Sequence, residues 1–189
     1  MNIFQQLQKI ETENKVIRWV RDNLVLNSHT KEFHFTEAQR SVLIDYQDNE
    51  RYYKMNRQSG KTTLLKCECL YHAFKHPYSV HIVFGMSRTQ ASRLCSDYVE
   101  TLTASGMANK IIQNSMYKIT LENRSEIYFV TPAGFDQQSS NINMRDKKRF
   151  VYCDEINEIV PRLAYARTIK AKFLAFTTLQ PERIDTYGE

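Results

Sequence analysis

A glycine, a lysine and a threonine stand together at residues 60 to 62, between a segment with the pattern of a strand and one with the pattern of a helix. The strand is expected at 52–55 and the helix should run to about Phe74. A glycine here lets the backbone wrap closely around an anion, and the free N–H groups at a helix start bind phosphate oxygens. Lys61 would add a point charge, and the hydroxyl of Thr62 could ligate magnesium. The pattern therefore predicts a phosphate-binding loop.

The three residues alone are weak evidence, because Gly-Lys-Ser/Thr occurs by chance in about a tenth of chains of this length. The loop also departs from the usual pattern, since Met55 occupies the position of its first glycine. The alternative is an ordinary helix start with a solvated lysine. The strand before the loop and the helix after it favour the phosphate loop.

Two adjacent acids end an apolar strand much later in the chain. The run from Phe150 to Cys153 is followed by Asp154 and Glu155. At the carboxyl end of a parallel strand beside the phosphate loop, the first acid can hold magnesium through water and the second can orient the attacking water. Neighbouring residues of an extended strand point to opposite sides, which suits two different tasks. The alternative is a polar strand end next to a helix cap.

The order of the remaining patterns indicates an α/β fold. In chain order we expect one or two N-terminal helices through Leu24, a helix from Thr36 to Asp48, the strand at 52–55 and the helix after the loop. Next come a strand at 80–84, a helix capped by Ser87 and ending near Thr103, and a hairpin of 117–121 and 127–129. We then expect a surface loop over 133–148, a strand at 150–153, a short helix after Pro161 and a strand at 173–177. Strands alternating with helices predict a mostly parallel central sheet flanked by helices, with the antiparallel hairpin as an addition.

The chain has 189 residues, enough for one compact domain. We expect an N-terminal helical segment at 1–48 and a nucleotide-binding core at 49–181. No apolar run approaches the roughly 20 residues of a membrane helix, and the first residues lack a secretory pattern. The four cysteines are not spaced as a disulfide framework. These features predict a cytoplasmic protein with reduced thiols and no membrane span, and the net charge of +5 weakly favours a polyanionic partner.

The segment Arg57-Gln58-Ser59-Gly60-Lys61-Thr62-Thr63 resembles the phosphate loop of the ATPase domain of the large terminase subunit, the motor that packages DNA into tailed phages. Loops of that family carry Arg-Gln-x-Gly-Lys-Ser/Thr with a non-glycine start, which accommodates Met55. The resemblance covers most of residues 35 to 181. It implies a P-loop NTPase fold and ATP and Mg2+ as cofactors.

The resemblance also assigns roles to single residues. Gln39 matches the glutamine that reads the adenine edge, although its spacing from Thr36 equally fits a capping box. Arg57 matches an arginine that stabilises charge on the transferring phosphoryl group, with a surface salt bridge as the alternative. Thr177 and Thr178 match the motif that couples hydrolysis to movement, although threonines at a strand end are ordinary.

The expected site follows from these assignments. The nucleotide-binding residues would be Gln39, Arg57, Gln58, Ser59, Gly60, Lys61, Thr62, Thr63, Asp154, Thr177 and Thr178, with Glu155, Arg57 and Lys61 as catalytic residues and Thr62 and Asp154 as magnesium ligands. Arg145 lies where the family often has Arg-Gly, but Asp146 replaces that glycine, so a contact there is in doubt.

The function implied by the resemblance is ATP-driven translocation of double-stranded DNA in the cytoplasm of a bacterial host. Expected partners are a portal protein, the small terminase subunit, further copies of the chain in a homo-oligomeric ring and a nuclease domain on a separate chain or missing segment. Few residues follow Thr178, so no nuclease domain and no DNA cleavage are expected. A helicase-like DNA-stimulated ATPase and a nucleotide-binding accessory protein without turnover remain open.

Two further clusters have functional and ordinary interpretations. The basic groups Arg145, Lys147, Lys148, Arg149 and Arg162, Arg167, Lys170 could each contact DNA phosphates or belong to solvated loops. Cys69, His72 and His76 fall on one face of a helix at a spacing that could hold a metal ion. Because only three ligands converge there, packing of a small thiol against a sheet is the favoured interpretation.

Overall fold

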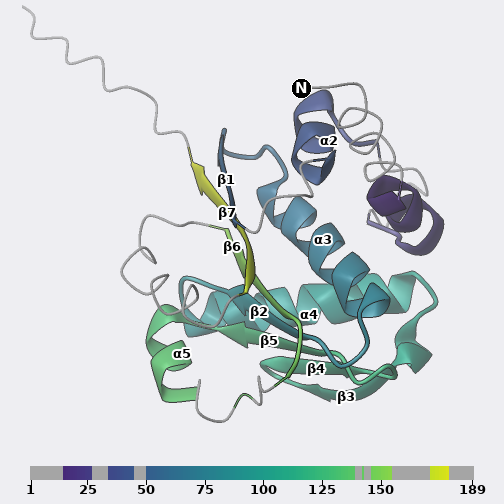
Figure 1. The fold of residues 1–189 in the computed structure, drawn as a ribbon, viewed down its shortest axis with the longest axis vertical. Coiled ribbons are helices and arrows are strands. Elements are labelled where there is room, and N and C mark those ends of the chain that lie inside the picture. Colours follow the sequence, from purple (N-terminus) through teal and green to yellow (C-terminus); the bar gives the residue numbers. More distant parts are fainter. Residues whose placement is uncertain are drawn as a thin grey trace, which may run out of the picture.

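The computed structural model of the chain describes residues 15–26, 34–44, 50–138, 142, 146–154 and 171–178. Its centre is a seven-stranded sheet in the order β1-β7-β6-β2-β5-β4-β3 (Figure 1). The strands are β1 (Glu50–Met55), β2 (Val80–Phe84), β3 (Ile111–Ser115), β4 (Lys118–Leu121), β5 (Glu126–Val130), β6 (Arg149–Cys153) and β7 (Lys172–Thr178). The helices are α2 (Glu37–Ile44), α3 (Lys61–Lys75), α4 (Arg88–Ala104), α5 (Pro132–Gln138), a 3-10 turn η1 (Ala108–Lys110) and a helical segment at 15–23.

Five strands of the sheet are parallel and two are antiparallel additions. β1 pairs with β7, β7 with β6, β6 with β2 and β2 with β5, all in parallel. β4 then runs antiparallel to β5, and β3 antiparallel to β4. The predicted fold class, a mostly parallel sheet with a hairpin addition, is confirmed. One detail differs from the simplest expectation, because β6 does not lie directly beside β1 and β7 separates them.

The central strand β2 explains why helices cover both faces of the sheet. All five of its residues are buried. Val80, Ile82 and Phe84 belong to a core cluster on one face that also contains Phe135 of α5. Val83 belongs to the larger cluster on the other face, which is built with α3, α4 and the segment at 15–23. Successive residues of a strand alternate between faces, so a strand buried on both sides needs apolar cover on each.

Local signals in the sequence set several element ends correctly. Ser87 caps α4, because the Gln90 backbone N–H donates to the Ser87 hydroxyl at 3.2 Å. The predicted strand at 80–84 has the observed bounds, and the predicted hairpin at 117–121 and 127–129 is β4 with β5. The helix expected from Thr36 corresponds to α2, which is described from Glu37 to Ile44. Residues 1–14 and the helix expected after Pro161 lie outside the described residues.

Three elements were not predicted: α5, β3 and the 3-10 turn η1. The stretch 133–148 was expected to be a surface loop, but α5 occupies its start and buries Phe135. The Phe135 ring meets Phe84 edge-on at a centroid distance of 5.3 Å, so one aromatic residue anchors this polar segment on the sheet. β3 was missed because it lies at the sheet edge with four of its five residues exposed, and such a strand lacks the alternating burial that marks a strand in sequence.

The four cysteines are free and buried, as the sequence predicted. Across the described ranges, none of the helices combines the length and the apolar character that a membrane crossing requires.

Candidate nucleotide-binding site

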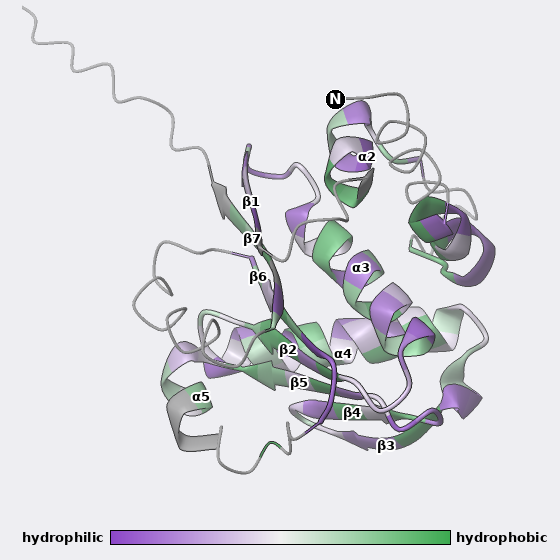
Figure 2. Ribbon diagram, in the orientation of Figure 1, coloured by the Kyte–Doolittle hydropathy of each residue, from purple (hydrophilic) through white to green (hydrophobic). Residues whose placement is uncertain are grey.

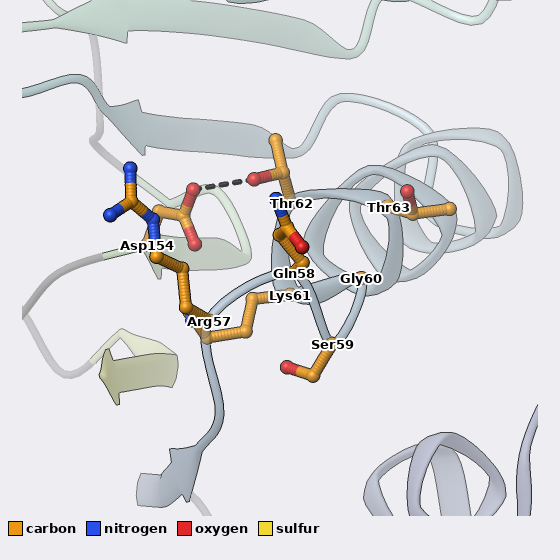
Figure 3. Close-up of a pocket in the computed structure, with 8 residues that line it drawn as sticks. All are labelled: Arg57, Gln58, Ser59, Gly60, Lys61, Thr62, Thr63 and Asp154. Atoms are coloured by element: carbon orange, nitrogen blue, oxygen red, sulfur yellow. Dashed lines mark hydrogen bonds between the residues drawn. The ribbon is translucent and has the colours of Figure 1, made fainter. Parts of the chain in front are cut away.

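The loop between β1 and α3 borders a cavity of about 580 Å³. Its lining residues are Arg57, Gln58, Ser59, Gly60, Lys61, Thr62, Thr63 and Asp154 (Figure 3). Seven of them are the consecutive residues singled out as a phosphate loop, and the eighth follows β6. The cavity therefore brings together the two segments that the sequence analysis placed at one site.

The backbone of the loop is shaped as anion binding requires. Gln58 has a φ of 60° and Gly60 a φ of 82°, so both adopt the left-handed conformation. Gly60 precedes α3 without any side-chain cap, and the first helical hydrogen bond runs from the Leu64 N–H to the Gly60 carbonyl at 3.0 Å. The N–H groups of the first turn of a helix have no acceptor within the helix, so this end of α3 can donate to an anion.

Two side chains of the loop carry polar atoms suited to phosphate. Lys61 is largely buried, and its ammonium donates to the Asn56 carbonyl at 3.1 Å. The Ser59 hydroxyl is buried and has no hydrogen-bond partner within the described part of the chain. Buried polar groups are normally paired. Phosphate oxygens would supply the Ser59 hydroxyl with an acceptor and Lys61 with a counter-charge, so these residues fit a triphosphate.

Thr62 and Asp154 meet across the cavity although they are 92 positions apart in sequence. The Thr62 hydroxyl donates to one Asp154 carboxylate oxygen, and the two oxygens are 2.5 Å apart (Figure 3). A hydroxyl beside a carboxylate is a donor set that magnesium prefers in proteins. The pair fits a magnesium ion that also contacts the nucleotide phosphates.

The sheet topology explains this meeting. Parallel strands end at the same edge, and β1, β7 and β6 all end near the phosphate loop. Met55, the last residue of β1, is in register with Thr178 at the end of β7. The backbone of Thr177 and Thr178 therefore lies at this edge, between the loop strand and the acidic strand. Nothing is described of their side chains, so their contacts with nucleotide remain a prediction.

Of the two roles considered for Gln39 in the sequence, the structure shows the capping box. The side-chain amide oxygen of Gln39 accepts from the Thr36 backbone N–H at 2.9 Å, and its backbone N–H donates to the Thr36 hydroxyl at 3.3 Å, so the capping box is present. Its amide nitrogen donates to the Ser59 carbonyl at 2.9 Å, which ties the start of α2 to the phosphate loop. Gln39 is buried behind the loop and is not among the residues lining the cavity. Its contact with adenine remains a prediction.

Arg57 is exposed at the cavity and makes no ion pair with any carboxylate in the described ranges. The surface salt bridge considered for it is therefore not seen there. Glu155 and Arg145 lie outside the described residues, so the role expected for each stays a prediction. The sequence did not reveal that the Asn56 carbonyl holds Lys61, because a backbone contact leaves no signature in residue type.

The alternative metal site on α3 is not supported. The described residues contain no group of three His, Cys, Asp or Glu side chains that could hold a metal ion. His72 and His76 instead stack with each other at 5.6 Å, and both rings also stack on Phe150. In the first basic cluster, Lys147 pairs with Glu126 at 2.8 Å. The second cluster, Arg162, Arg167 and Lys170, lies outside the described residues.

The sequence matches no family model and no curated protein. Solved structures match in fold. The large terminase of bacteriophage HK97 matches with a TM-score of 0.66 and 14% identity, over 89% of this chain and 38% of that chain. The large terminase ATPase domain of Thermus phage P74-26 matches with a TM-score of 0.56 and 17% identity, over 86% and 69%. The yeast DEAD-box splicing factor Prp28 matches with a TM-score of 0.56 and 13% identity, over 89% and 45%.

The present chain thus spans well under half the length of the HK97 protein. Identities this low establish a shared fold and leave the activity to be tested. The resemblance that the loop and the acidic strand predicted is confirmed at the level of fold: the chain shares its fold with the large terminase of bacteriophage HK97 and with the large terminase ATPase domain of Thermus phage P74-26.

Proposed function

We propose that the chain is the ATP-hydrolysing motor domain of a viral DNA-packaging terminase, which couples ATP hydrolysis to translocation of double-stranded DNA. The observation that carries this proposal is the contact between Thr62 and Asp154 at the phosphate-loop cavity. It joins a phosphate-binding element to an acidic strand end, the two parts that a P-loop ATPase needs. The likeness in fold to two phage terminases supports the finer assignment.

In this proposal the loop holds the nucleotide and the acid holds the ion. The first turn of α3 and the Ser59 hydroxyl donate to phosphate oxygens, and Lys61 exchanges the Asn56 carbonyl for the terminal phosphates. Thr62 and Asp154 hold magnesium, which when bound would neutralise charge that develops on the phosphates. Gln39 links the base to the loop through its hydrogen bond with the Ser59 carbonyl.

The chemical step is assigned to the neighbours of these groups. Glu155 directly follows Asp154 and would orient the attacking water. Arg57 lies exposed at the cavity, where a guanidinium could move toward the transferring phosphoryl group and stabilise its charge. Thr177 and Thr178 would sense the loss of the terminal phosphate from the strand between the loop and the acid.

Steady-state ATPase rates and nucleotide affinities of three variants test the site. Lys61→Ala should lose nucleotide affinity, whereas Glu155→Gln should keep affinity and lose turnover by about 100-fold or more. Lys54→Ala is the matched control, because Lys54 is exposed on β1 and does not line the cavity. If Lys61→Ala and Glu155→Gln both matched the parent, the site assignment would be wrong. Binding without turnover in the parent would favour the accessory protein.

A helicase-like ATPase is the second candidate, and the fold match to the DEAD-box factor Prp28 favours it. Both functions use ATP and nucleic acid, so an assay of the mechanical product must separate them. Packaging of DNA into procapsids that carry a portal, with the small subunit and a nuclease domain supplied in trans, would identify the motor. Unwinding of a forked duplex without capsids would identify the helicase. The ring of copies and the host cytoplasm are parts of the first proposal only.

A further inference from the structure

The end of α3 that lies farthest from the phosphate loop carries a group of exposed lysines from three separate segments. Lys75 ends α3, Lys148 precedes β6 and Lys172 begins β7, and all three are exposed. Because α3 has 15 residues, this surface is about 22 Å from the phosphate loop. Figures 1 and 2 show the two ends of α3 at opposite ends of the parallel strands. We name Lys75, Lys148 and Lys172 the edge lysines.

The edge lysines converge because their segments pack around the stacked rings of His76 and Phe150. Lys148 lies with its Nζ 3.3 Å from Nδ1 of His76. The His76 ring stacks on Phe150 at 5.6 Å, and Phe150 is in register with Lys172 across β6 and β7. Lys75 directly precedes His76. The fold therefore brings three positive charges close enough to act on the same histidine, His76.

The electrostatic effect of this arrangement is visible on its members. Burial lowers the pKa of Lys172, and the positive charges of Arg51, Lys148 and Lys75 lower it further. The pKa of His76 is lowered to about 4, by burial first and then by Lys148, Lys75 and Lys172. His76 is accordingly neutral at pH 7. Like charges held this close raise the free energy of the unliganded protein, and an anionic partner would offset that cost.

Carboxylates of the adjoining turn and strand already hold other cations. Glu122 pairs with Lys110 at 2.7 Å. Glu126 pairs with Lys118 at 2.6 Å and with Lys147 at 2.8 Å. Lys110, Lys118 and Lys147 are thus paired with these two carboxylates.

An exposed tyrosine lies in the loop that follows Lys75. Tyr78 is 64% exposed and has a φ of 58°, a conformation that is costly for a residue with a side chain. Its backbone N–H donates to the Asn123 carbonyl at 3.2 Å, which fixes the loop. A tyrosine hydroxyl is a common donor to DNA phosphates. Single strands are bound by several stacking aromatics in succession, and the described part of this edge offers only Tyr78 as an exposed aromatic.

We infer that the edge lysines and Tyr78 form a docking surface for the phosphate backbone of duplex DNA. The inference deepens the proposed function, which names duplex DNA as the partner, and it adds the surface that touches it. Contacts to backbone phosphates carry no sequence information, so this surface suits a partner of any sequence. Its separation from the phosphate loop would let DNA and nucleotide bind at the same time.

Fluorescence anisotropy with a short labelled duplex tests the inference on the full chain. The triple variant Lys75→Gln/Lys148→Gln/Lys172→Gln should bind more weakly and with a shallower salt dependence. Removal of three phosphate contacts should lower the slope of log K against log salt by about 2.7. Between about 50 and about 200 mM salt, the affinity of the parent should therefore fall by about 40-fold more than that of the variant.

The matched control is Lys15→Gln/Arg18→Gln/Arg93→Gln, which removes the same charge from exposed positions on other helices. This control variant should keep most of the slope of log K against log salt that the parent shows. An unchanged slope in the edge variant, or an equal loss in both variants, would overturn the inference. So would tighter binding of a single strand than of the duplex.

Two further readouts keep this test separate from the proposed function. The edge variant should change the melting temperature little, because relief of repulsion offsets the lost hydrogen bond of 2.9 Å from the Lys75 ammonium to the Tyr71 hydroxyl. It should also keep the ATPase rate measured without DNA, because none of its changes touches the cavity. A normal ATPase rate with unchanged DNA binding refutes the docking surface alone, whereas a parent without ATPase activity refutes the proposed function.

Discussion

Gly60 shows at the scale of one residue why the phosphate loop needs a glycine. Its φ is 82°, and an added Cβ would lie 2.4 Å from the amide nitrogen of Gln39. Gly60→Ala should therefore lose about 1–2 kcal/mol to backbone strain, and more by displacing Gln39. Gly106→Ala is the control, because Gly106 has a φ of 73° and no atom within 4 Å of the added Cβ. Thermal denaturation and nucleotide titration compare them, and equal losses would contradict the role of Gln39.

Gln39 itself makes two contacts that one substitution can separate. Its oxygen caps α2 through the Thr36 N–H, and its nitrogen donates to the Ser59 carbonyl. Gln39→Glu keeps an acceptor for Thr36 but cannot donate to Ser59, whereas Gln39→Ala loses both. We expect Gln39→Glu to lose about 1–3 kcal/mol of nucleotide binding with little change in the helix start, and Gln39→Ala to lose both. Calorimetric titration and denaturation measure the two effects. Equal behaviour of the variants would mean that the contact with Ser59 does not matter.

At the scale of elements, α3, β2 and β6 are joined by stacked aromatic rings that include buried histidines. His72 and His81 each stack on Phe150 at 4.7 Å, and the Ser79 hydroxyl lies 2.7 Å from Nε2 of His81. Burial lowers the pKa of His81 to about 3 and that of His72 well below its ordinary value. These rings therefore stay neutral in the folded chain while the unfolded chain binds protons below about pH 6.5.

This difference fixes the sign of a pH effect on stability. Unfolding takes up protons below about pH 6.5, so the stability from neutral burial is present above that pH and is lost as the pH falls. Each such histidine should lower the free energy of unfolding by about 1.4 kcal/mol per pH unit between about pH 6 and pH 4. Urea denaturation across that range measures the slope of the unfolding free energy against pH. His81→Gln should reduce this slope by about 1.4 kcal/mol per pH unit, which corresponds to the uptake of one proton. A slope unaffected by His81→Gln would show that this imidazole is already protonated in the folded chain.

At the scale of the whole molecule, the sequence predicted those features that depend on interactions between residues close together in the chain. The apolar run of β2, the cap at Ser87 and the loop at Gly60 each act within a few residues, and each was predicted correctly. The place of β7 between β1 and β6 was not predicted, because strand order depends on pairing between distant segments. α5 was missed because the burial of Phe135 depends on Phe84, far away in sequence.

The candidate site follows the same division. The phosphate loop is one continuous segment, so its residues could be read directly from the sequence, and the acid at 154 could be assigned to it by the rule that parallel strands end at one edge. The double use of Gln39 needed the position of Ser59, which only the fold supplies. The edge lysines come from three segments and became a group only when the sheet brought them together.

The proposed site requires that one triphosphate binds where the turn at Gly60 meets the end of β6. A crystal structure with a non-hydrolysable ATP analogue and magnesium tests it most directly. We expect the terminal phosphates on Lys61, with a magnesium ion beside Thr62 and Asp154. Nucleotide bound elsewhere on the chain, or a magnesium ion far from both residues, would contradict it.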